Sequence, residues 1–291
     1  MVYSHCKSAK SLWNAVRTQV SSSAASPQES AAIAQALLEH ICGLSSVDTV
    51  VDKFCVLRTE QLAFLKKALE RLSRHEPLQY ILEKAYFLGR PFKVNPTVLI
   101  PRPETEEMVA AILSEILPEQ SSVLDVGTGS GCIAITLQCE RSDACVLGVD
   151  SCTKALQLAS QNGRSLGAKV VWQRCDVLAE ALPDQKWHVV VSNPPYVLSA
   201  EKENMSPRVL NHEPSTAIFV PDEDPLLFHR IIALQAMDRL HSEGKLYMEI
   251  NETLGKETAL LVVGAGFSEV EVKKDLHGKD RWIRAVRPTV C

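Results

Sequence analysis

The chain has 291 residues, of which 46% are hydrophobic and 23% charged, and its formal net charge is −4 at pH 7. This length suits a small domain joined to a larger one, and the composition excludes a disordered or low-complexity chain. The acidic balance argues against a surface built mainly to neutralise the phosphates of a nucleic acid. No stretch approaches the roughly 18 apolar residues that a membrane span requires.

The nine cysteines form no Cys-x-x-Cys pair and no cluster at the spacing of metal ligands, so we expect no structural metal site. Several lie within apolar patterns, which is typical of reduced, buried thiols in a cytoplasmic protein. The nine are Cys6, Cys42, Cys55, Cys132, Cys139, Cys145, Cys152, Cys175 and Cys291.

Apolar residues recur every three to four positions in the first quarter of the chain, which predicts a small helical domain over residues 1–75. The first 28 residues contain no acid and are rich in serine, as transit peptides are. Leu12, Val16 and Val20 nevertheless fall at helical spacing. We therefore expect an ordinary first helix.

The pattern changes in residues 76–103, which are rich in β-forming residues and interrupted by glycine and proline. This segment is interpreted as a β-hairpin connector. A helical pattern then begins, and Glu104 and Glu106 lie in its first turn. These acids either complement the positive end of the helix or lie beside a functional site. Arg102 is likewise either structural, paired with Glu213 or another acid, or close to the functional site.

Residues 104–291 are predicted to form the larger domain. Beyond Pro118, short apolar runs alternate with helical segments, which predicts a parallel sheet with helices on both faces. The last two strands are joined by a short turn that contains residues 277–280, so these strands must be antiparallel. A seven-stranded, mostly parallel sheet that ends in this way resembles the Rossmann-like class I methyltransferase fold. The expected strands are Ser122–Val126, Ala144–Asp150, Val170–Asp176, Trp187–Asn193, Lys245–Ile250, Glu269–Lys273 and Arg281–Val286.

A glycine-rich turn follows the first of these strands. It contains Gly127, Thr128, Gly129, Ser130 and Gly131, and its glycines allow positive φ and close approach of a ligand to the backbone. A dinucleotide fingerprint would have its third glycine one residue later, so this register favours S-adenosylmethionine over NAD. The alternative is a tight link between strand and helix without a ligand.

Acids end the second and third strands. Asp150 can accept hydrogen bonds from both ribose hydroxyls of a nucleoside. Asp176 is placed either to meet the adenine amino group or to cap the next helix. Ligands of such sheets collect at the carboxyl ends of the strands, so the acids and the glycine turn should converge.

The tetrapeptide Asn193-Pro194-Pro195-Tyr196 ends the fourth strand. Its prolines fix the backbone and leave carbonyls without a local donor. An amide or aromatic amine is a poor nucleophile because its lone pair is delocalised, so an enzyme gains most by orienting it. The Asn193 side-chain oxygen and the Pro194 carbonyl can accept its two N–H groups, and Tyr196 can stack on the planar group. These three residues are our candidate catalytic residues; the alternative is a surface turn.

The chain resembles the HemK/PrmC family of release factor glutamine methyltransferases in several motifs. They are His75–Ile81, Ile100–Glu106, Asp125–Gly131, Asn193–Tyr196, Asn211–Pro214 and Lys274–Arg281. The resemblance implies that residues 127–131, Asp150 and Asn193 contact S-adenosylmethionine. Residues 193–196 would hold the glutamine of the Gly-Gly-Gln loop of class 1 peptide chain release factors for methylation on its side-chain nitrogen. The helical domain would grip the release factor, and the protein would be a monomer.

Two departures from the family pattern stand out. Glu83 and Lys84 replace a frequent glycine, and Val177 replaces an aromatic residue of some members. The main alternative function is a DNA or RNA amino-group methyltransferase, which would use the same acceptors but would benefit from a basic surface. A non-catalytic binding protein is a further alternative, opposed by the intact Asn193–Tyr196 segment.

Overall fold

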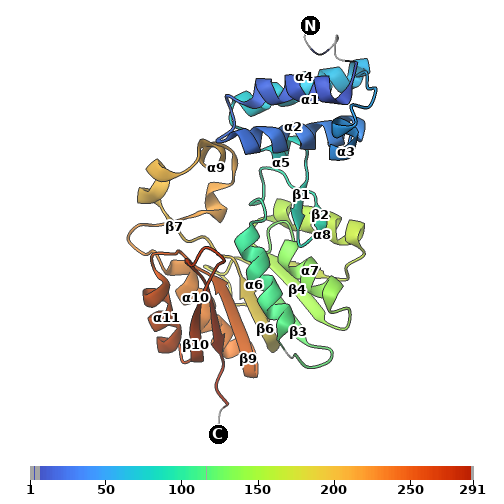
Figure 1. Ribbon diagram of the computed structural model, residues 1–291. Coiled ribbons are helices and arrows are strands. Elements are labelled where there is room, and N and C mark those ends of the chain that lie inside the picture. Colours follow the sequence, from blue (N-terminus) through green and yellow to red (C-terminus); the bar gives the residue numbers. More distant parts are fainter. Residues whose placement is uncertain (1–2, 4–6, 116, 290–291) are drawn as a thin grey trace. The chain divides into compact units, whose positions relative to one another are not determined.

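The computed structural model describes residue 3, residues 7–115 and residues 117–289 (Figure 1). It divides into two compact units. The helical unit comprises residues 1–84 together with residues 206–212, and the sheet unit comprises residues 85–205 and 213–291. Within the described residues, no helix is both long enough and apolar enough to cross a membrane.

The helical unit is a bundle with its own apolar core. The Ser8 and Ser26 side chains accept backbone N–H groups at the starts of the first two long helices, as N-cap residues do. Leu12, Val16 and Val20 are buried in the core, so the expected first helix is confirmed. The helices are α1 (Ala9–Val20), α2 (Pro27–Cys42), α3 (Ser46–Val50), α4 (Thr59–Ser73), α5 (Leu78–Ile81) and the distant α9 (Pro207–His212).

Helix α9 belongs to this bundle although it follows the fourth long strand of the sheet in sequence. Arg208 forms an ion pair with Glu29 and donates to the Ser23 carbonyl over 2.5 Å. The His212 ring lies 3.0 Å from the Arg74 carbonyl. Sequence periodicity did not predict this association, because nothing local to α9 specifies its partners.

The sheet unit contains seven strands in the order β10-β11-β9-β6-β3-β4-β5. All neighbours are parallel except β11, which is antiparallel to both β9 and β10. The predicted mostly parallel sheet is confirmed. The strands are β3 (Ser122–Val126), β4 (Cys145–Asp150), β5 (Val171–Arg174), β6 (Trp187–Ser192), β9 (Leu240–Glu249), β10 (Ser268–Lys274) and β11 (Asp280–Val286).

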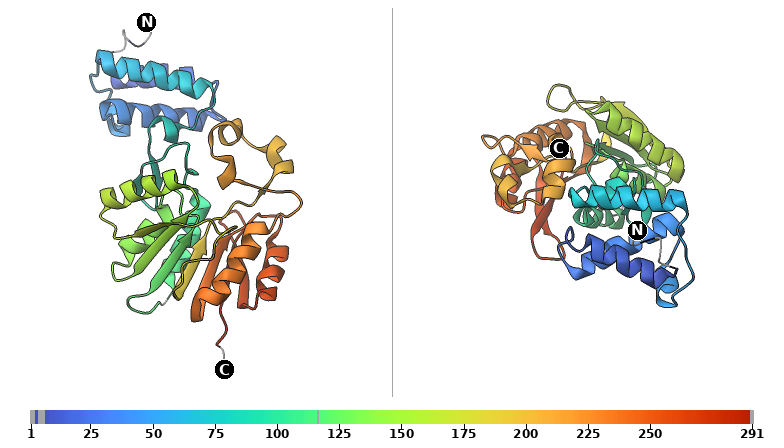
Figure 2. Two further views of the ribbon diagram at one scale, coloured as in Figure 1. Left: turned by 180° about the vertical axis from the view of Figure 1, so that it is seen from behind. Right: turned by 90° about the horizontal axis from the view of Figure 1, so that it is seen from above.

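Helices cover both faces of this sheet, as the front and rear views in Figures 1 and 2 show. Val189 and Val191 of β6 pack with α6 and α7, whereas Val190 packs with α10 and α11. Successive side chains of a strand point to opposite faces, so two covered faces explain why all three valines are fully buried. The main helices of this unit are α6 (Pro103–Ser114), α7 (Cys132–Glu140), α8 (Thr153–Leu166), α10 (Leu227–Arg239) and α11 (Gly255–Gly264).

Short elements complete the sheet unit. Strands β1 (Ala85–Phe87) and β2 (Arg90–Phe92) form the expected antiparallel hairpin, and Glu106 accepts the Leu88 N–H in its turn at 2.9 Å. Farther along the chain are β7 (Val197–Leu198) and β8 (Phe219–Val220), which pair in parallel, and the 3-10 helices η2 (Ser199–Asn204) and η3 (Ser215–Ala217). Glu106 therefore has a structural role at this hairpin.

Glu83, which precedes the hairpin, has a φ of +50°. Residues with a side chain rarely adopt this conformation, which glycine adopts readily.

The expectation that the cysteines are buried was partly wrong. Cys132 and Cys175 are buried, but Cys145 and Cys152 are exposed at the start of β4 and just before α8. Both lie where an element meets a loop, and apolar periodicity does not distinguish the end of an element from its interior. Cys6 and Cys291 lie outside the described residues.

Candidate active site

The glycine turn joins β3 to α7. Gly127, Gly129 and Gly131 have φ values of +74°, +55° and +82°, so all three need the left-handed region that glycine favours. Around Gly127 there is open space where a side chain would begin, whereas a Cβ on Gly131 would lie 2.9 Å from Trp172. Gly131 is thus required by packing, and the first part of the turn leaves its backbone accessible to a ligand.

The side chains within this turn point inward. Thr128 is buried and donates to the Asp125 carboxylate at 2.6 Å, and Ser130 is also buried. Burial raises the pKa of Asp125 to about 7, although the Thr128 hydroxyl and the Ala134 N–H stabilise its charged form. The Thr128 N–H and carbonyl are also hydrogen-bonded within the protein, so direct contacts of Thr128 and Ser130 with a ligand stay a prediction.

Asp150, at the end of β4, is bound to the same turn. One carboxylate oxygen accepts the Gly129 N–H at 2.9 Å and the other accepts the Cys152 N–H at 2.8 Å. Burial raises the pKa of Asp150, and these two donors oppose the shift. A carboxylate oxygen can accept more than one hydrogen bond, so the group can still meet ribose hydroxyls.

Asp176 follows β5 and accepts the Leu178 N–H at 3.1 Å. A turn, not a helix, follows it, so its local role is to stabilise that turn. A contact with adenine stays a prediction.

The tetrapeptide Asn193–Tyr196 begins beside the glycine turn. Ser192 pairs with Val126 in the parallel register of β6 and β3, and its hydroxyl donates to the Val126 carbonyl at 2.7 Å. Asn193 directly follows β6 and Gly127 directly follows β3, so the two motifs start at the same edge of the sheet. Among the residues that the structure describes, the Pro194 carbonyl has no hydrogen-bond partner.

A hydrogen-bonded chain holds the side chains of this tetrapeptide. Asn193 donates from Nδ2 to Thr105 Oγ1 at 3.1 Å, and Thr105 donates to Glu249 Oε2 at 2.6 Å. Tyr196 donates its phenol proton to the other Glu249 oxygen at 2.8 Å. Burial and the negative Glu249 raise the pKa of Tyr196 well above its ordinary value, so its hydroxyl remains a donor.

Sequence reasoning missed Glu249 and gave Thr105 no role of its own. The available signal was an acid at the end of the apolar run of β9, the strand that pairs with β6. Such an acid is unusual in a strand covered on both faces.

Arg102 forms the predicted ion pair with Glu213, at 2.6 Å. The Glu213 carboxylate is buried and also accepts the Ile100 N–H at 3.1 Å. This pair joins the segment before α6 to the chain after α9. The structural interpretation of Arg102 is confirmed.

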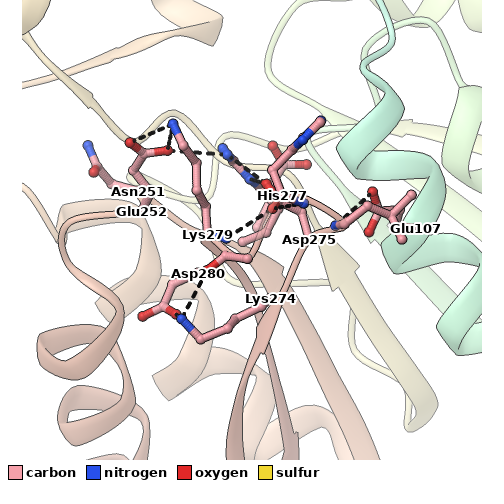
Figure 3. Close-up of polar contacts among 12 residues, drawn as sticks. Glu107, Asn251, Glu252, Lys274, Asp275, His277, Lys279 and Asp280 are labelled. Atoms are coloured by element: carbon pink, nitrogen blue, oxygen red, sulfur yellow. Dashed lines mark hydrogen bonds and ion pairs between the residues drawn. The ribbon is translucent and has the colours of Figure 1, made fainter.

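The turn between β10 and β11 is built on Asp275 (Figure 3). Its carboxylate accepts the N–H groups of His277 and Lys279 at 2.9 and 3.0 Å and the Arg281 Nε at 3.1 Å. Glu252 pairs with both Lys279 and Arg281 from the neighbouring loop, as the dashed lines in Figure 3 show for Lys279. These contacts place a positive charge at the start of β11.

Two family models match the chain. One, described as PrmC N-terminal domain, matches residues 18–82, and the other, Methyltransferase small domain, matches residues 107–214. The release factor glutamine methyltransferase of Bacteroides thetaiotaomicron is 41% identical and aligns over 90% of this chain and 94% of its own length. The chain belongs to the release factor glutamine methyltransferase family.

Other members of this family are similar along most of the chain. The release factor glutamine methyltransferase of Streptococcus pneumoniae is 40% identical over 78% of this chain and 81% of its own length. That of Leptospira interrogans is 35% identical over 87% of this chain and 90% of its own length. The resemblance inferred from the sequence motifs is confirmed.

Solved methyltransferase structures share the fold. A methyltransferase from Pyrococcus furiosus has a TM-score of 0.53 at 14% identity and covers 80% of this chain and 100% of its own. A 16S rRNA methyltransferase from Thermus thermophilus, solved with AdoMet and guanosine, has a TM-score of 0.51 at 17% identity, over 70% of this chain and 49% of its own. At such identities the likeness shows the fold alone, and the predicted class I methyltransferase fold is confirmed.

Proposed function

We propose that this chain methylates the side-chain nitrogen of the glutamine in the Gly-Gly-Gln loop of class 1 peptide chain release factors. The most direct support comes from two hydrogen-bond acceptors, the Asn193 Oδ1 and the Pro194 carbonyl oxygen. Neither has a hydrogen-bond partner among the described residues, although the rest of the Asn193 amide is held by Thr105. The names of the relatives support the choice of substrate.

S-adenosylmethionine is the proposed methyl donor. The open space where a side chain would begin at Gly127 and Gly129 and the carboxylate of Asp150 fit the amino-acid and ribose parts of this molecule. When bound, it supplies a methyl group on a positive sulfur that becomes neutral on transfer. A base strong enough to remove a proton in advance is therefore not required.

The chain's own residues orient the acceptor. The two N–H groups of the substrate amide donate to Asn193 Oδ1 and the Pro194 carbonyl, which turns the nitrogen lone pair toward the donor. These bonds increase the electron density on nitrogen as the new N–C bond forms and the S–C bond to the methyl group breaks, and the nitrogen then releases one of its two protons to solvent. The ring of Tyr196 covers the planar amide and excludes water.

We propose that the helical unit binds the release factor at a surface away from its Gly-Gly-Gln loop. We also propose that the enzyme acts as a monomer, without direct nucleic-acid binding, in the cytoplasm where translation ends.

The test is to incubate the protein with labelled S-adenosylmethionine and, separately, with release factor, tRNA, rRNA and DNA. We expect label on the release factor alone, and mass spectrometry should locate one added methyl group on the Gln of Gly-Gly-Gln. Label on a nucleic acid would instead support the amino-group methyltransferase alternative.

A further inference from the structure

Glu249 is a buried carboxylate at the end of β9, with only 1% of its surface exposed. Burying such a group without partners is unfavourable, and both of its oxygens do have donors, Thr105 from α6 and Tyr196 from the segment after β6. A buried ionic group is weak evidence for a purely stabilising role, because well-packed apolar residues often stabilise as much. The arrangement therefore calls for another explanation.

The position of Glu249 is itself restrained. The buried His229 ring donates from Nε2 to the Glu249 carbonyl at 2.9 Å, since a carbonyl can only accept. Burial lowers the pKa of His229, which favours the neutral ring. The end of β9 is thus held from the α10 side while the Glu249 side chain reaches toward Thr105 and Tyr196.

The direction of each hydrogen bond follows from the chemistry of the groups. Thr105 donates to Glu249 Oε2, and in its ionised form that carboxylate can only accept, so the single proton of the Thr105 hydroxyl goes to Glu249. The Thr105 oxygen is then left as an acceptor and requires a donor from Asn193, which can only be the Nδ2 end of its amide. The Asn193 oxygen consequently faces away from Thr105.

We propose that Glu249 and Thr105 are positioning residues for methyl transfer, which set the orientation of the Asn193 amide so that its oxygen is presented to the acceptor nitrogen. Through its second oxygen, Glu249 also holds Tyr196 by its hydroxyl. The proposal rests on the proposed function, because it assigns the orienting groups of that same site. If the Asn193 amide were reversed, its N–H group would face an N–H group of the substrate, and one of the two acceptors would be lost.

The pKa of Glu249 is raised, because burial is the largest influence on it and the negative charge of Glu104 adds to the effect. The hydrogen bonds from Thr105 and Tyr196 and the positive charge of Arg281 act in the opposite direction and favour the ionised form. Arg281 is in turn held by Asp275 and Glu252. The turn between β10 and β11 thereby contributes to the same arrangement.

The first test compares Thr105→Val with Thr105→Ser in the full chain. Valine has nearly the same shape but no hydroxyl, so kcat with release factor should fall roughly 10- to 100-fold. Serine keeps the hydroxyl and should retain kcat within about twofold, because the hydrogen bonds to Glu249 and from Asn193 can still form. Calorimetry should find the affinity for S-adenosylmethionine nearly unchanged in both variants, since the Thr105 hydroxyl is bonded to Asn193 and Glu249 and not to the glycine turn.

The second test adds Glu249→Gln and the double variant with Thr105→Val. Glutamine can donate to Thr105, which frees the threonine proton to bond to Asn193 in the reversed orientation, so kcat should fall at least as much as in Thr105→Val. If both residues act through one chain, the double variant should be no slower than the slower single variant.

Distinct outcomes would overturn each proposal. If the wild-type protein does not methylate release factor, the proposed function is wrong, and so is the positioning role of Glu249 and Thr105 that rests on it. Suppose that the wild-type protein is active, but that Thr105→Val has the same kcat or that Thr105→Ser is as slow as Thr105→Val. Only the positioning role of Glu249 and Thr105 is then rejected. Equal losses of kcat and of cofactor affinity in a folded Thr105→Val variant would likewise reject it in favour of a merely structural role.

Discussion

In the described part of the chain, the side-chain amide of Asn193 is hydrogen-bonded through its nitrogen but not through its oxygen. Its Nδ2 is bound to Thr105, and its Oδ1 has no partner among the described residues. We expect Asn193→Ala to reduce kcat by about 100-fold or more, because one of two orienting acceptors is lost. Cofactor affinity should change much less. Single-turnover kinetics and calorimetry would measure the two effects, and an equal loss of both would mean that Asn193 mainly supports the cofactor.

Trp172 explains Gly148 near the proposed cofactor site, as it does Gly131. A Cβ on Gly148 would lie 2.5 Å from the indole, whereas a Cβ on Gly163 would lie at an ordinary 3.5 Å from the same ring. Gly148→Ala should therefore destabilise the protein by about 1 to 3 kcal/mol through overpacking.

Gly163→Ala is the matched control. It should be neutral or stabilising by up to about 1 kcal/mol, because Gly163 lies within α8 and alanine favours a helix. Denaturant unfolding of both variants measures the difference. Similar stabilities for the two would show that the indole moves aside readily.

At the scale of elements, Glu115 connects the end of α6 to two strands. Its carboxylate pairs with Lys245 of β9 and accepts from Arg284 of β11 at 2.7 Å and from the Tyr247 hydroxyl at 3.0 Å. Burial alone would raise its pKa, but these partners outweigh burial and lower the pKa from 4.5 to about 2. Since the folded-state pKa is depressed, the stabilisation is present above pH 4.5 and is lost as the pH falls toward 2.

Glu115→Gln should consequently reduce the free energy of unfolding by about 2 to 3 kcal/mol at neutral pH. The difference from the wild-type protein should shrink below pH 4.5 and vanish near pH 2. Unfolding measured across this pH range checks the prediction. A difference that does not depend on pH would indicate lost packing instead of a lost charge.

On the scale of the whole molecule, the chain leaves the sheet unit after residue 205 and returns at residue 213. Arg208 is the main polar attachment of this segment to the helical unit, through Glu29 and the Ser23 carbonyl. We expect Arg208→Ala to loosen the segment and to accelerate proteolytic cleavage within residues 202–206 severalfold, because local opening governs such cleavage.

Arg174→Ala is the control, because it removes an exposed ion pair with Glu180 on the sheet unit. Limited proteolysis followed by mass spectrometry compares the two variants. Equal cleavage rates would show that other contacts of α9, such as that of His212 with the Arg74 carbonyl, hold the segment in place without Arg208.

Much of the fold followed from local pattern. Helical spacing at Leu12, Val16 and Val20 predicted α1, and the short link before Arg281 predicted the antiparallel hairpin at the end of the sheet. Asp150 and the glycine turn were predicted to converge because parallel strands bring their carboxyl ends to one edge, and Asp150 accepts the Gly129 N–H. These are properties of short segments, or general consequences of sheet geometry.

The sequence by itself determined the elements, the sheet type, the glycine turn and the tetrapeptide, since each depends on neighbouring residues. Only the tertiary structure decided that α9 joins the helical unit, that Cys145 and Cys152 are exposed, and that Glu249 meets Thr105. Contacts between residues so far apart along the chain depend on which elements pack together. No local pattern of apolar and polar residues carries that information.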